Sequence, residues 1–529
     1  MSIKKMIIKS FTALSFLWFV TLTAAGGTFS PMNPSQGVGT AESPYQISTP
    51  EHLAWMAEMV NGGNHLSDLY FVQVNDIDLA ETKNLNGGEG WMPIGGYFMI
   101  GGVRTKTGFE GHYDGQGHSI THLYINRPGE EYQALFGYVA QGSVRNLTLL
   151  DAFVAGLENV AVAFAYTFES RIENCHVKKS EIDCMAFYAG GLIGFQAWGR
   201  TEHSSADVTL SGRDYIGGLI GWCEEGAVIG CHAQGQVLGT VFNGIQPRHC
   251  GGLVGFCNKS TVERASCTTS LIEGGEWTGG LFGSLEHSKV SESVSRCGKV
   301  MGVSYVGGIA GRTNESTIRN CYTSSAVEGD QNVGGVSGFF TYSTSLLDCV
   351  YSIGQVTAAS TSSMFVGAVL GGYGTGTIKN VIYDKTVNPT LPGIAGPNGG
   401  DSDVKPRSPE EMRQEDSYPN WDFNKTWLLS SSYNNGLPIL RWEIDPLWSG
   451  LSDLGVEESS LMLSCRGDMI YITTSPEVEL VSIYGLDGIA IPFMSVAVGE
   501  YALSFRMSPP ILILVYRCHG KLQVTKRIL

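Results

Sequence analysis

Residues 188–195 read YAGGLIGF, and the phrase returns as YIGGLIGW at 215–222 and HCGGLVGF at 249–256. Four later copies follow at the same kind of spacing: WTGGLFGS (277–284), YVGGIAGR (305–312), NVGGVSGF (332–339) and FVGAVLGG (365–372). The period is about 28 residues, which indicates a stack of small repeated units. Two intervals are longer and predict inserted loops, from Thr240 to His249 and from Ala358 to Met364.

Each unit contains short segments rich in β-branched residues, separated by Gly, Ser, Asn and Asp. Segments this short cannot bury a face alone, so neighbouring units must stack. The pattern predicts a parallel β-solenoid over residues 151–385, with eight or nine rungs about 4.8 Å apart. Identical side chains then form ladders, as at Leu192, Leu219, Leu253, Leu281, Ile309, Val336 and Val369.

The glycine pairs of the phrase are predicted to be structural. Glycine allows positive φ at corners and close approach of neighbouring backbone. Both alternating sets of side chains in the phrase are mostly apolar. The sequence therefore does not decide which set faces inward, or whether a bend at the glycine pair switches the faces. The predicted structural glycines are Gly190, Gly191, Gly217, Gly218, Gly251, Gly252, Gly279, Gly280, Gly307, Gly308, Gly334 and Gly335.

Cysteines recur between the copies, usually three residues after a β-branched residue or Leu. At the ends of the array Leu147 and Val381 take the same place, so we expect a buried ladder slot. Parallel side chains in register fit a disulfide dihedral poorly, which predicts mostly free thiols. Of the tail cysteines, Cys465 and Cys518 are the better candidates for a disulfide. The predicted ladder is Cys175, Cys231, Cys267, Cys297, Cys321 and Cys349.

Composition limits the partners. Glycine supplies 69 of 529 residues, and charged residues make up 16%, against a usual value of about 25%. The formal net charge is -16 and no basic stripe is present, which argues against nucleic acid. No Cys or His pair has C-x-x-C spacing, so we expect neither a metal nor a cofactor.

The first 25 residues are predicted to be a signal peptide. Lys4, Lys5 and Lys9 precede an apolar run at 11–22, which small residues follow. The run is shorter than the roughly 20 residues of a spanning helix, and no later segment is long enough. The mature chain is therefore expected to be secreted or held at the cell surface.

The repeated G-L-x-G phrase resembles the GLUG-motif proteins, which are repeat proteins of bacterial surfaces. The opening segments of residues 26–150 fit the same family as a cap and first rungs, with one helix from Pro50 to Val60. DGQGHSI (114–120) is similar to the first coil of right-handed parallel β-helices of the pectin-lyase type. SPEEMRQ, WDFNKTW and GLPILRW, within residues 386–450, resemble the family's closing rung.

Residues 451–529 lack the repeat and alternate short apolar strands with turns, which predicts a small β-sandwich. VSIYGLDG (481–488) and the final strands resemble the sorting tail of type IX secretion substrates, which implies contact with secretion machinery. The tail departs from that pattern where SPP precedes the penultimate strand. A sandwich that caps the solenoid is the alternative.

Carboxylates are the first candidates for chemistry. Asp76 and Asp78 would share one face of a strand, where paired carboxylates could act as acid and base, or they order the following turn. Asp114 in a D-G turn is expected to shape that turn. We find no nucleophile elbow and no lyase or hydrolase constellation, so no catalytic residues are assigned.

An aromatic column stands two residues before the glycine pairs. Stacked exposed rings would suit a glycan chain or a protein partner; the alternative is that they pack inside or cover a corner. We therefore predict an adhesin-like binding protein that uses solenoid faces and loops, with a polysaccharide lyase or hydrolase and a passive spacer as alternatives. The column consists of Tyr188, Tyr215, Trp277, Tyr305 and Phe365.

Overall fold

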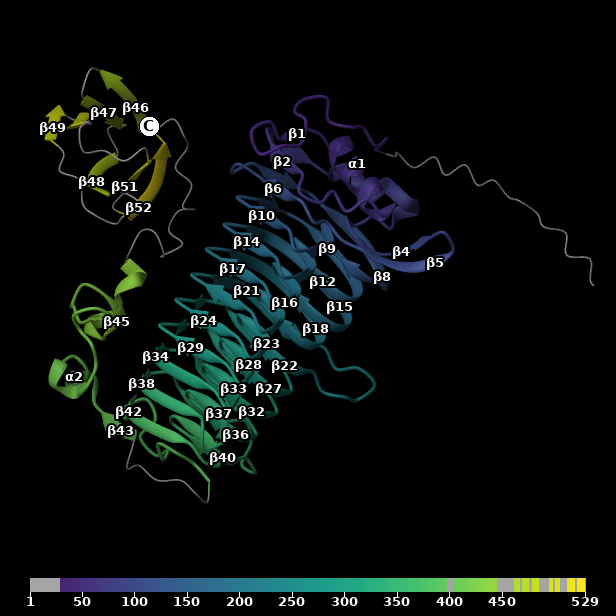
Figure 1. Cartoon of the computed structure of the whole chain (residues 1–529). Coiled ribbons are helices and arrows are strands. Elements are labelled where there is room, and N and C mark those ends of the chain that lie inside the picture. The colour runs from purple at the N-terminus through teal and green to yellow at the C-terminus, as the bar shows by residue number, and fades with distance from the viewer. Residues whose placement is uncertain are drawn as a thin grey trace, which may run out of the picture.

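The computed structural model describes residues 29–396 and 404–444, together with the backbone of seven strands between Leu461 and Ile528. The predicted signal peptide lies outside the described residues. The chain winds into a parallel β-solenoid whose rungs stack along one axis (Figure 1). The predicted all-β fold with rungs of about 28 residues is thereby confirmed.

Each rung has three sides, as one turn of the chain illustrates. A short first side, β17 (Arg200–Glu202), leads to a long second side, β18 (Ser205–Gly217), and then to a third side, β19 (Ile220–Glu224). First and second sides belong to one 32-stranded sheet, and the third sides form a separate nine-stranded sheet. The third-side strands are β9 (Phe136–Ala140), β13 (Phe164–Phe168), β16 (Ile193–Ala197), β19, β23 (Val254–Asn258), β28 (Phe282–Glu286), β33 (Ala310–Asn314), β37 (Ser337–Thr341) and β41 (Leu370–Tyr373).

The glycine pair marks the corner between the second and third sides. β15 (His176–Gly190) ends at the first glycine of its pair, and β16 begins three residues later. Leu192 and Ile193 are both fully buried although they are adjacent in sequence. The chain therefore bends at the pair and changes which residues face inward, which settles the question that periodicity left open.

Glycine is needed at this corner for close approach and not for backbone angle. All twelve predicted glycines lie in the described part of the chain, and none has positive φ. The prediction that glycine provides positive φ at these corners is therefore wrong. A Cβ on Gly217 would lie 2.0 Å from Ile220 O, and one on Gly218 would lie 2.2 Å from Gly252 O. The first contact is within the bend and the second is with the next rung, so neither side chain could be accommodated.

The N-terminal part adds rungs that lack the glycine phrase. Helix α1 (Pro50–Asn61) confirms the predicted helix, and its buried residues pack on the solenoid core. β1 (Tyr45–Ile47) and β2 (Tyr70–Gln73) begin the first side before any copy of the phrase. A hairpin of β4 (Gly96–Ile100) and β5 (Val103–Thr107) projects from this end (Figure 1).

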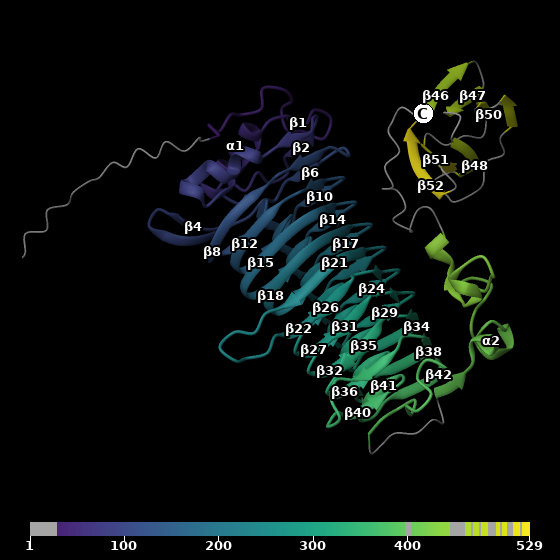
Figure 2. The ribbon, with the colours of Figure 1, turned by 180° about the vertical axis from the view of Figure 1, so that it is seen from behind.

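The segment after the repeats adds one strand to the stack and then leaves it. β43 (Val404–Arg407) pairs in parallel with β42 (Thr377–Asp384). The chain continues through α2 (Pro409–Met412) and the antiparallel pair β44 (Trp427–Leu428) and β45 (Ile439–Leu440), which lie along the outside of the last rungs (Figure 2). We call residues 408–444 the closing segment.

The tail consists of two antiparallel sheets, of four and three strands, as the sandwich prediction requires. Cys465 lies in the first sheet and Cys518 in the second, but their side chains are outside the described part, and so is any bond between them. The strands are β46 (Leu461–Arg466), β47 (Met469–Thr474), β50 (Glu500–Ser504) and β49 (Met494–Ala497), and β48 (Val478–Tyr484), β51 (Ile511–Cys518) and β52 (Lys521–Ile528).

Candidate functional site: an aromatic strip

Aromatic rings gather on the outside of the corner between the second and third sides. They form two parallel columns, which we call together the aromatic strip. The corner column contains Tyr188, Tyr215, His249, Trp277 and Tyr305. The sheet column, on the outer face of the third side, contains Tyr138, Tyr166, Phe195, Trp222, Phe256 and Phe339.

The corner column stands in a strained backbone conformation. Tyr215 has φ of 57°, and Trp277 has φ of 56°. The left-handed region costs a bulky residue roughly 1–2 kcal/mol, while each stacked ring pair contributes about 0.5–1.5 kcal/mol. The Tyr215 and His249 rings stack 4.5 Å apart at 11°, and His249 and Trp277 stack at 4.5 Å. Stacking along the column therefore offsets the strain of the corner.

Of the predicted aromatic residues, four lie together in this column, half-buried and on the outside of the solenoid. Phe365 is in register but stands apart, because Asn332 takes the intervening rung. His249 is a member that the search for Tyr, Trp and Phe missed. Burial, followed by the nearby Arg248 and Arg312, lowers the pKa of His249 to about 3, so it is a neutral ring at neutral pH.

The sheet column is absent from the sequence prediction. Its signal was available, because a ring ends four of the seven copies of the phrase. Tyr166 and Phe195 stack 4.9 Å apart at 9°, and Phe195 and Trp222 stack 5.6 Å apart at 10°. Ser284 and Arg312 interrupt the column before Phe339.

The two columns meet edge to face. The Tyr188 ring lies 5.3 Å from Phe195 at 83°, and Tyr215 lies 5.9 Å from Phe256 at 88°. Neighbours within each column cover the ring faces, so the strip presents mainly ring edges to solvent. This geometry suits broad apolar contact better than stacking of a sugar ring on a free aromatic face.

The hairpin closes the N-terminal end of the strip. Lys106 Nζ on β5 lies 3.8 Å from the ring centre of Tyr138 and 4.0 Å from that of Tyr166. Burial lowers the pKa of Lys106 to about 8. The ammonium group binds these rings by a cation–π contact, which holds the hairpin against the end of the strip.

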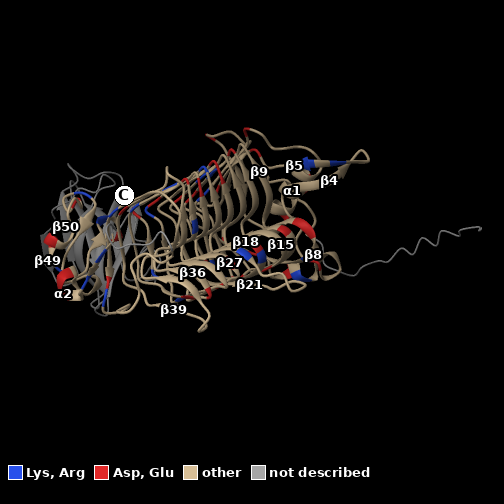
Figure 3. Cartoon of the chain, turned by 90° about the horizontal axis from the view of Figure 1, so that it is seen from below, with Lys and Arg blue, Asp and Glu red and all other residues tan. Residues whose placement is uncertain are grey.

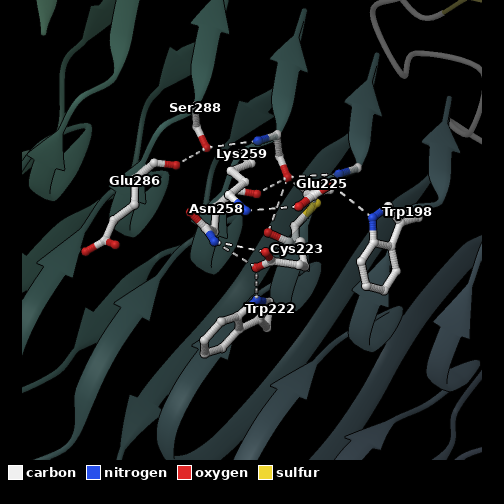
Figure 4. A network of polar contacts seen from close by, with 11 residues as sticks. Trp198, Trp222, Cys223, Glu225, Asn258, Lys259, Glu286 and Ser288 are labelled. Carbon is white, nitrogen blue, oxygen red and sulfur yellow. Dashed lines mark hydrogen bonds and ion pairs between the residues drawn. The ribbon is translucent and has the colours of Figure 1, made fainter. Parts of the chain in front are cut away.

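A row of polar contacts borders the sheet column (Figure 4). Trp222 Nε1 donates to Glu224 Oε2 at 3.0 Å, and Asn258 Nδ2 donates to Glu224 Oε1 at 2.9 Å. One position further along the rung, Glu225 accepts from Trp198 Nε1 and pairs with Lys259 Nζ, both at 3.0 Å. These contacts link successive rungs and fix the orientation of the Trp222 ring.

The predicted cysteine ladder divides into three sites. Cys175, Cys231 and Cys321 occupy one inner column, as expected from the stacked residues three positions earlier. Cys267 and Cys297 lie deeper along their rungs, with Sγ atoms 3.3 Å apart. Cys349 takes a corner position with φ of 54°, because Leu347 and not Leu346 stacks in the first side.

All six ladder cysteines are buried, and the ten cysteines of the described residues are free thiols. Burial raises the pKa of the Cys175 and Cys321 thiols to about 12. Neutral buried thiols pack as small apolar groups and are poor nucleophiles.

The carboxylates considered for chemistry are engaged in hydrogen bonds, Asp76 with the next rung and Asp78 and Asp114 partly within their own turns. Asp76 accepts from Ser119 N at 2.7 Å, and Asp78 accepts from Ala80 N at 2.9 Å and lies 2.8 Å from His122 Nδ1. Hydrogen bonds lower the pKa of both carboxyl groups. Asp114 accepts from Gln116 N at 2.9 Å, which is the turn contact expected for it.

The first inserted loop is an exposed apolar finger, and it projects beside β22 (Arg248–Gly251) in Figure 1. Phe242 and Ile245 exchange backbone hydrogen bonds across a tight turn, and both side chains are exposed. The second loop, before β40 (Met364–Gly367), exposes Met364.

Lys, Arg, Asp and Glu are interspersed along the described rungs (Figure 3). Among the described residues, no cluster of His, Cys, Asp or Glu has the geometry of a metal site. No helix in the described part combines the length and the apolar character that crossing a membrane requires.

Comparison with known proteins finds partial relatives. No family model matches the chain. A segment of 120 residues, 22% of the chain, is 40% identical to a protein of Evansella cellulosilytica named "Putative Gly-rich membrane protein" and covers 12% of it. A segment of 196 residues, 36% of the chain, is 30% identical to halomucin of Haloquadratum walsbyi and covers 2% of it. The chain thus spans a small part of both relatives.

Proposed function

We propose that this protein is an exported, adhesin-like β-solenoid that binds a partner at the cell surface through the aromatic strip. The strip supports the binding role, because aromatic residues are enriched at interfaces. The two relatives are named as a putative Gly-rich membrane protein and as halomucin, which supports a surface location. Membership of the GLUG-motif proteins remains part of this proposal and rests on the repeated phrase.

The ligand is a protein or a glycan, and the ring geometry favours a protein. Sugars bind aromatic residues by stacking on an open ring face, whereas the faces of Tyr215 and Phe195 are covered by their neighbours in the columns. A polypeptide can pack methyl and methylene groups against ring edges along several rungs. We therefore expect an extended protein surface as the partner.

Arrays of extracellular proteins and of glycans, probed with the mature chain, test this proposal. Trp222→Ser and Tyr215→Asn should each weaken binding of a captured protein about tenfold, as loss of an interface aromatic residue typically does. Both variants are expected to fold, because Ser284 and Asn332 occupy the same column positions in other rungs. Tyr433→Ser, which changes an exposed ring in the closing segment, is the control.

The alternatives give different results in the same experiments. A passive spacer would capture no protein and no glycan. A polysaccharide lyase or hydrolase would act on glycans and lose activity on Asp76→Asn, but general acids have a raised pKa, and the pKa of Asp76 is lowered. The proposed recognition of the tail by secretion machinery is tested by export of a chain that lacks residues 451–529.

A further inference from the structure

A groove opens on the first side of the N-terminal rungs, away from the aromatic strip. Its volume is about 230 Å³. β2, β6 (His112–Asp114), β10 (Ser143–Arg145) and β14 (Arg171–Glu173) pair in parallel and form its floor, while Ala41 and Pro44 lie along its wall. Because alternate residues point outward, each strand contributes two side chains to the groove.

One outward row supplies rings and hydroxyl groups. Tyr70 and His112 lie with their rings 4.5 Å apart, and His112 Nδ1 lies 2.9 Å from Ser143 Oγ. Both rings are partly exposed in the groove. This row offers apolar ring surface, together with groups that donate or accept hydrogen bonds.

The other outward row contains Asp114, Arg145 and Glu173, and together with Arg171 at the end of the first row it supplies paired charges. Arg145 Nη2 lies 2.9 Å from Asp114 Oδ2, and Arg171 Nη2 lies 3.2 Å from Glu173 Oε2. Both arginine side chains are more than half exposed, at 59% and 58%. The two cations and two carboxylates compensate each other, so the groove has no net charge to attract an ion.

The geometry points to a neutral sugar ring as the ligand of this groove. Neighbouring hydroxyl groups of a pyranose both donate and accept, so one pair can bridge a carboxylate and a guanidinium group. Apolar C–H groups of the sugar can pack on the exposed parts of the Tyr70 and His112 rings. The volume admits one ring or the end of a short chain, and convergent polar groups beside partly exposed rings suit a small polar ligand.

Saturation-transfer NMR with the full chain tests this assignment. The probes are the methyl glycosides of glucose, galactose, mannose and N-acetylglucosamine, with glucuronic acid as a charged comparison. At least one neutral glycoside should receive saturation, strongest at its ring C–H protons. Arg145→Gln and Arg171→Gln should each raise its Kd about tenfold, as expected for loss of a charged hydrogen bond.

Arg319→Gln is the matched control. Arg319 lies in the same outward column as Arg145, pairs with Asp348 at 3.3 Å and is far from the groove in sequence and along the stack. This variant, and Trp222→Ser in the aromatic strip, should leave the signal unchanged. Circular dichroism checks the fold of each variant. If one of the two arginine variants does not fold, the other is enough to test the assignment.

Three results would overturn the assignment. The first is no saturation of any neutral glycoside. The second is equal saturation in wild type and in both groove variants, which would place the sugar elsewhere. The third is binding of glucuronic acid in preference to the neutral probes, which would show an anion site.

Discussion

Gly218 shows what a single residue does for the stack. A Cβ at this position would lie 2.2 Å from Gly252 O in the next rung, and backbone cannot move aside as a side chain can. Gly218→Ala should therefore destabilise the protein by about 2–3 kcal/mol, the cost of overpacking. Gly129→Ala is the control, because nothing lies within 4 Å of a Cβ there. Urea unfolding of the two variants measures the difference; equal stability would show that the rungs separate easily.

His249 makes stability depend on pH. Its pKa is about 3 in the folded chain and about 6.5 when unfolded. The unfolded state therefore takes up a proton first, so stability is complete above pH 6.5 and falls as the pH drops toward 3. Each pH unit in that window costs up to about 1.4 kcal/mol. His249→Tyr copies the neighbouring corners and should remove this part of the acid sensitivity.

Chemical unfolding of His249→Tyr at pH 7.5 and pH 4 measures the change. The free energy of unfolding of His249→Tyr should exceed that of wild type only at the lower pH. His287→Gln, at an exposed corner paired with Glu315, provides the comparison. A gain of equal size at both pH values would mean that ring stacking, and not protonation, separates the variants.

The sequence predicts which residues stack in a ladder only where successive rungs have the same length. Leu192 and its successors were identified because the glycine pair fixes their place in every copy. The cysteine phrase has no such anchor. Val294 stands three residues before Cys297 and matches the spacing, but Val290 occupies the stacked position and Val294 lies in the following strand. Backbone pairing between strands sets the register of neighbouring rungs, and the spacing of residues in the sequence does not determine it.

At the scale of elements, Glu443 holds the closing segment against the solenoid. Its side chain is 8% exposed, and it contacts the Arg296 guanidinium group and accepts from Tyr322 OH at 2.9 Å. Glu443→Gln leaves Arg296 without its counter-charge and should destabilise the attachment by about 2 kcal/mol, the value of a charged hydrogen bond. Faster hydrogen exchange in residues 408–444 would report the loss.

Glu410→Gln controls for a change of charge alone, because Glu410 is exposed on α2. Exchange in the third-side strands should be the same in both variants, since they do not contact the closing segment. Unchanged exchange in Glu443→Gln would assign the attachment to the buried tryptophans, Trp427 and Trp442, instead.

The closing segment also shows where sequence patterns end. Its phrases resemble a closing rung, yet the strand that joins the stack, Val404–Arg407, precedes it. The closing segment itself covers Tyr322 and Tyr351, two rings that stack 4.7 Å apart on the outside of the last rungs. The spacing of the repeats does not show that a second-side residue is covered from outside. A tyrosine buried in the solenoid core and a tyrosine buried under an outer segment look the same in the sequence.

At the scale of the molecule, the solenoid is a sum of similar rungs. Each rung pairs only with its two neighbours, so stability is expected to be additive along the axis. The aromatic strip and the charged columns follow the same rule, since each rung contributes one position to each column, even where Ser284, Arg312 or Asn332 replaces a ring. Sequence could therefore predict the architecture from one repeated phrase, while the neutral-sugar groove gave no signal, because three of its four rungs lack that phrase.

This additivity predicts the outcome of removing a rung. Deletion of residues 191–217 joins Gly190 to Gly218 and leaves every remaining side in register, because both glycines open the same corner. The shortened chain should fold, lose about 4.8 Å of length by X-ray scattering, and keep the strand signal of wild type. Deletion of residues 191–204 removes the third side β16 and the first side β17, so the second side β18 would follow the second side β15 directly and the core ladders would face solvent. That chain should not fold; if both deletions fold equally well, neighbouring rungs do not set each other's register.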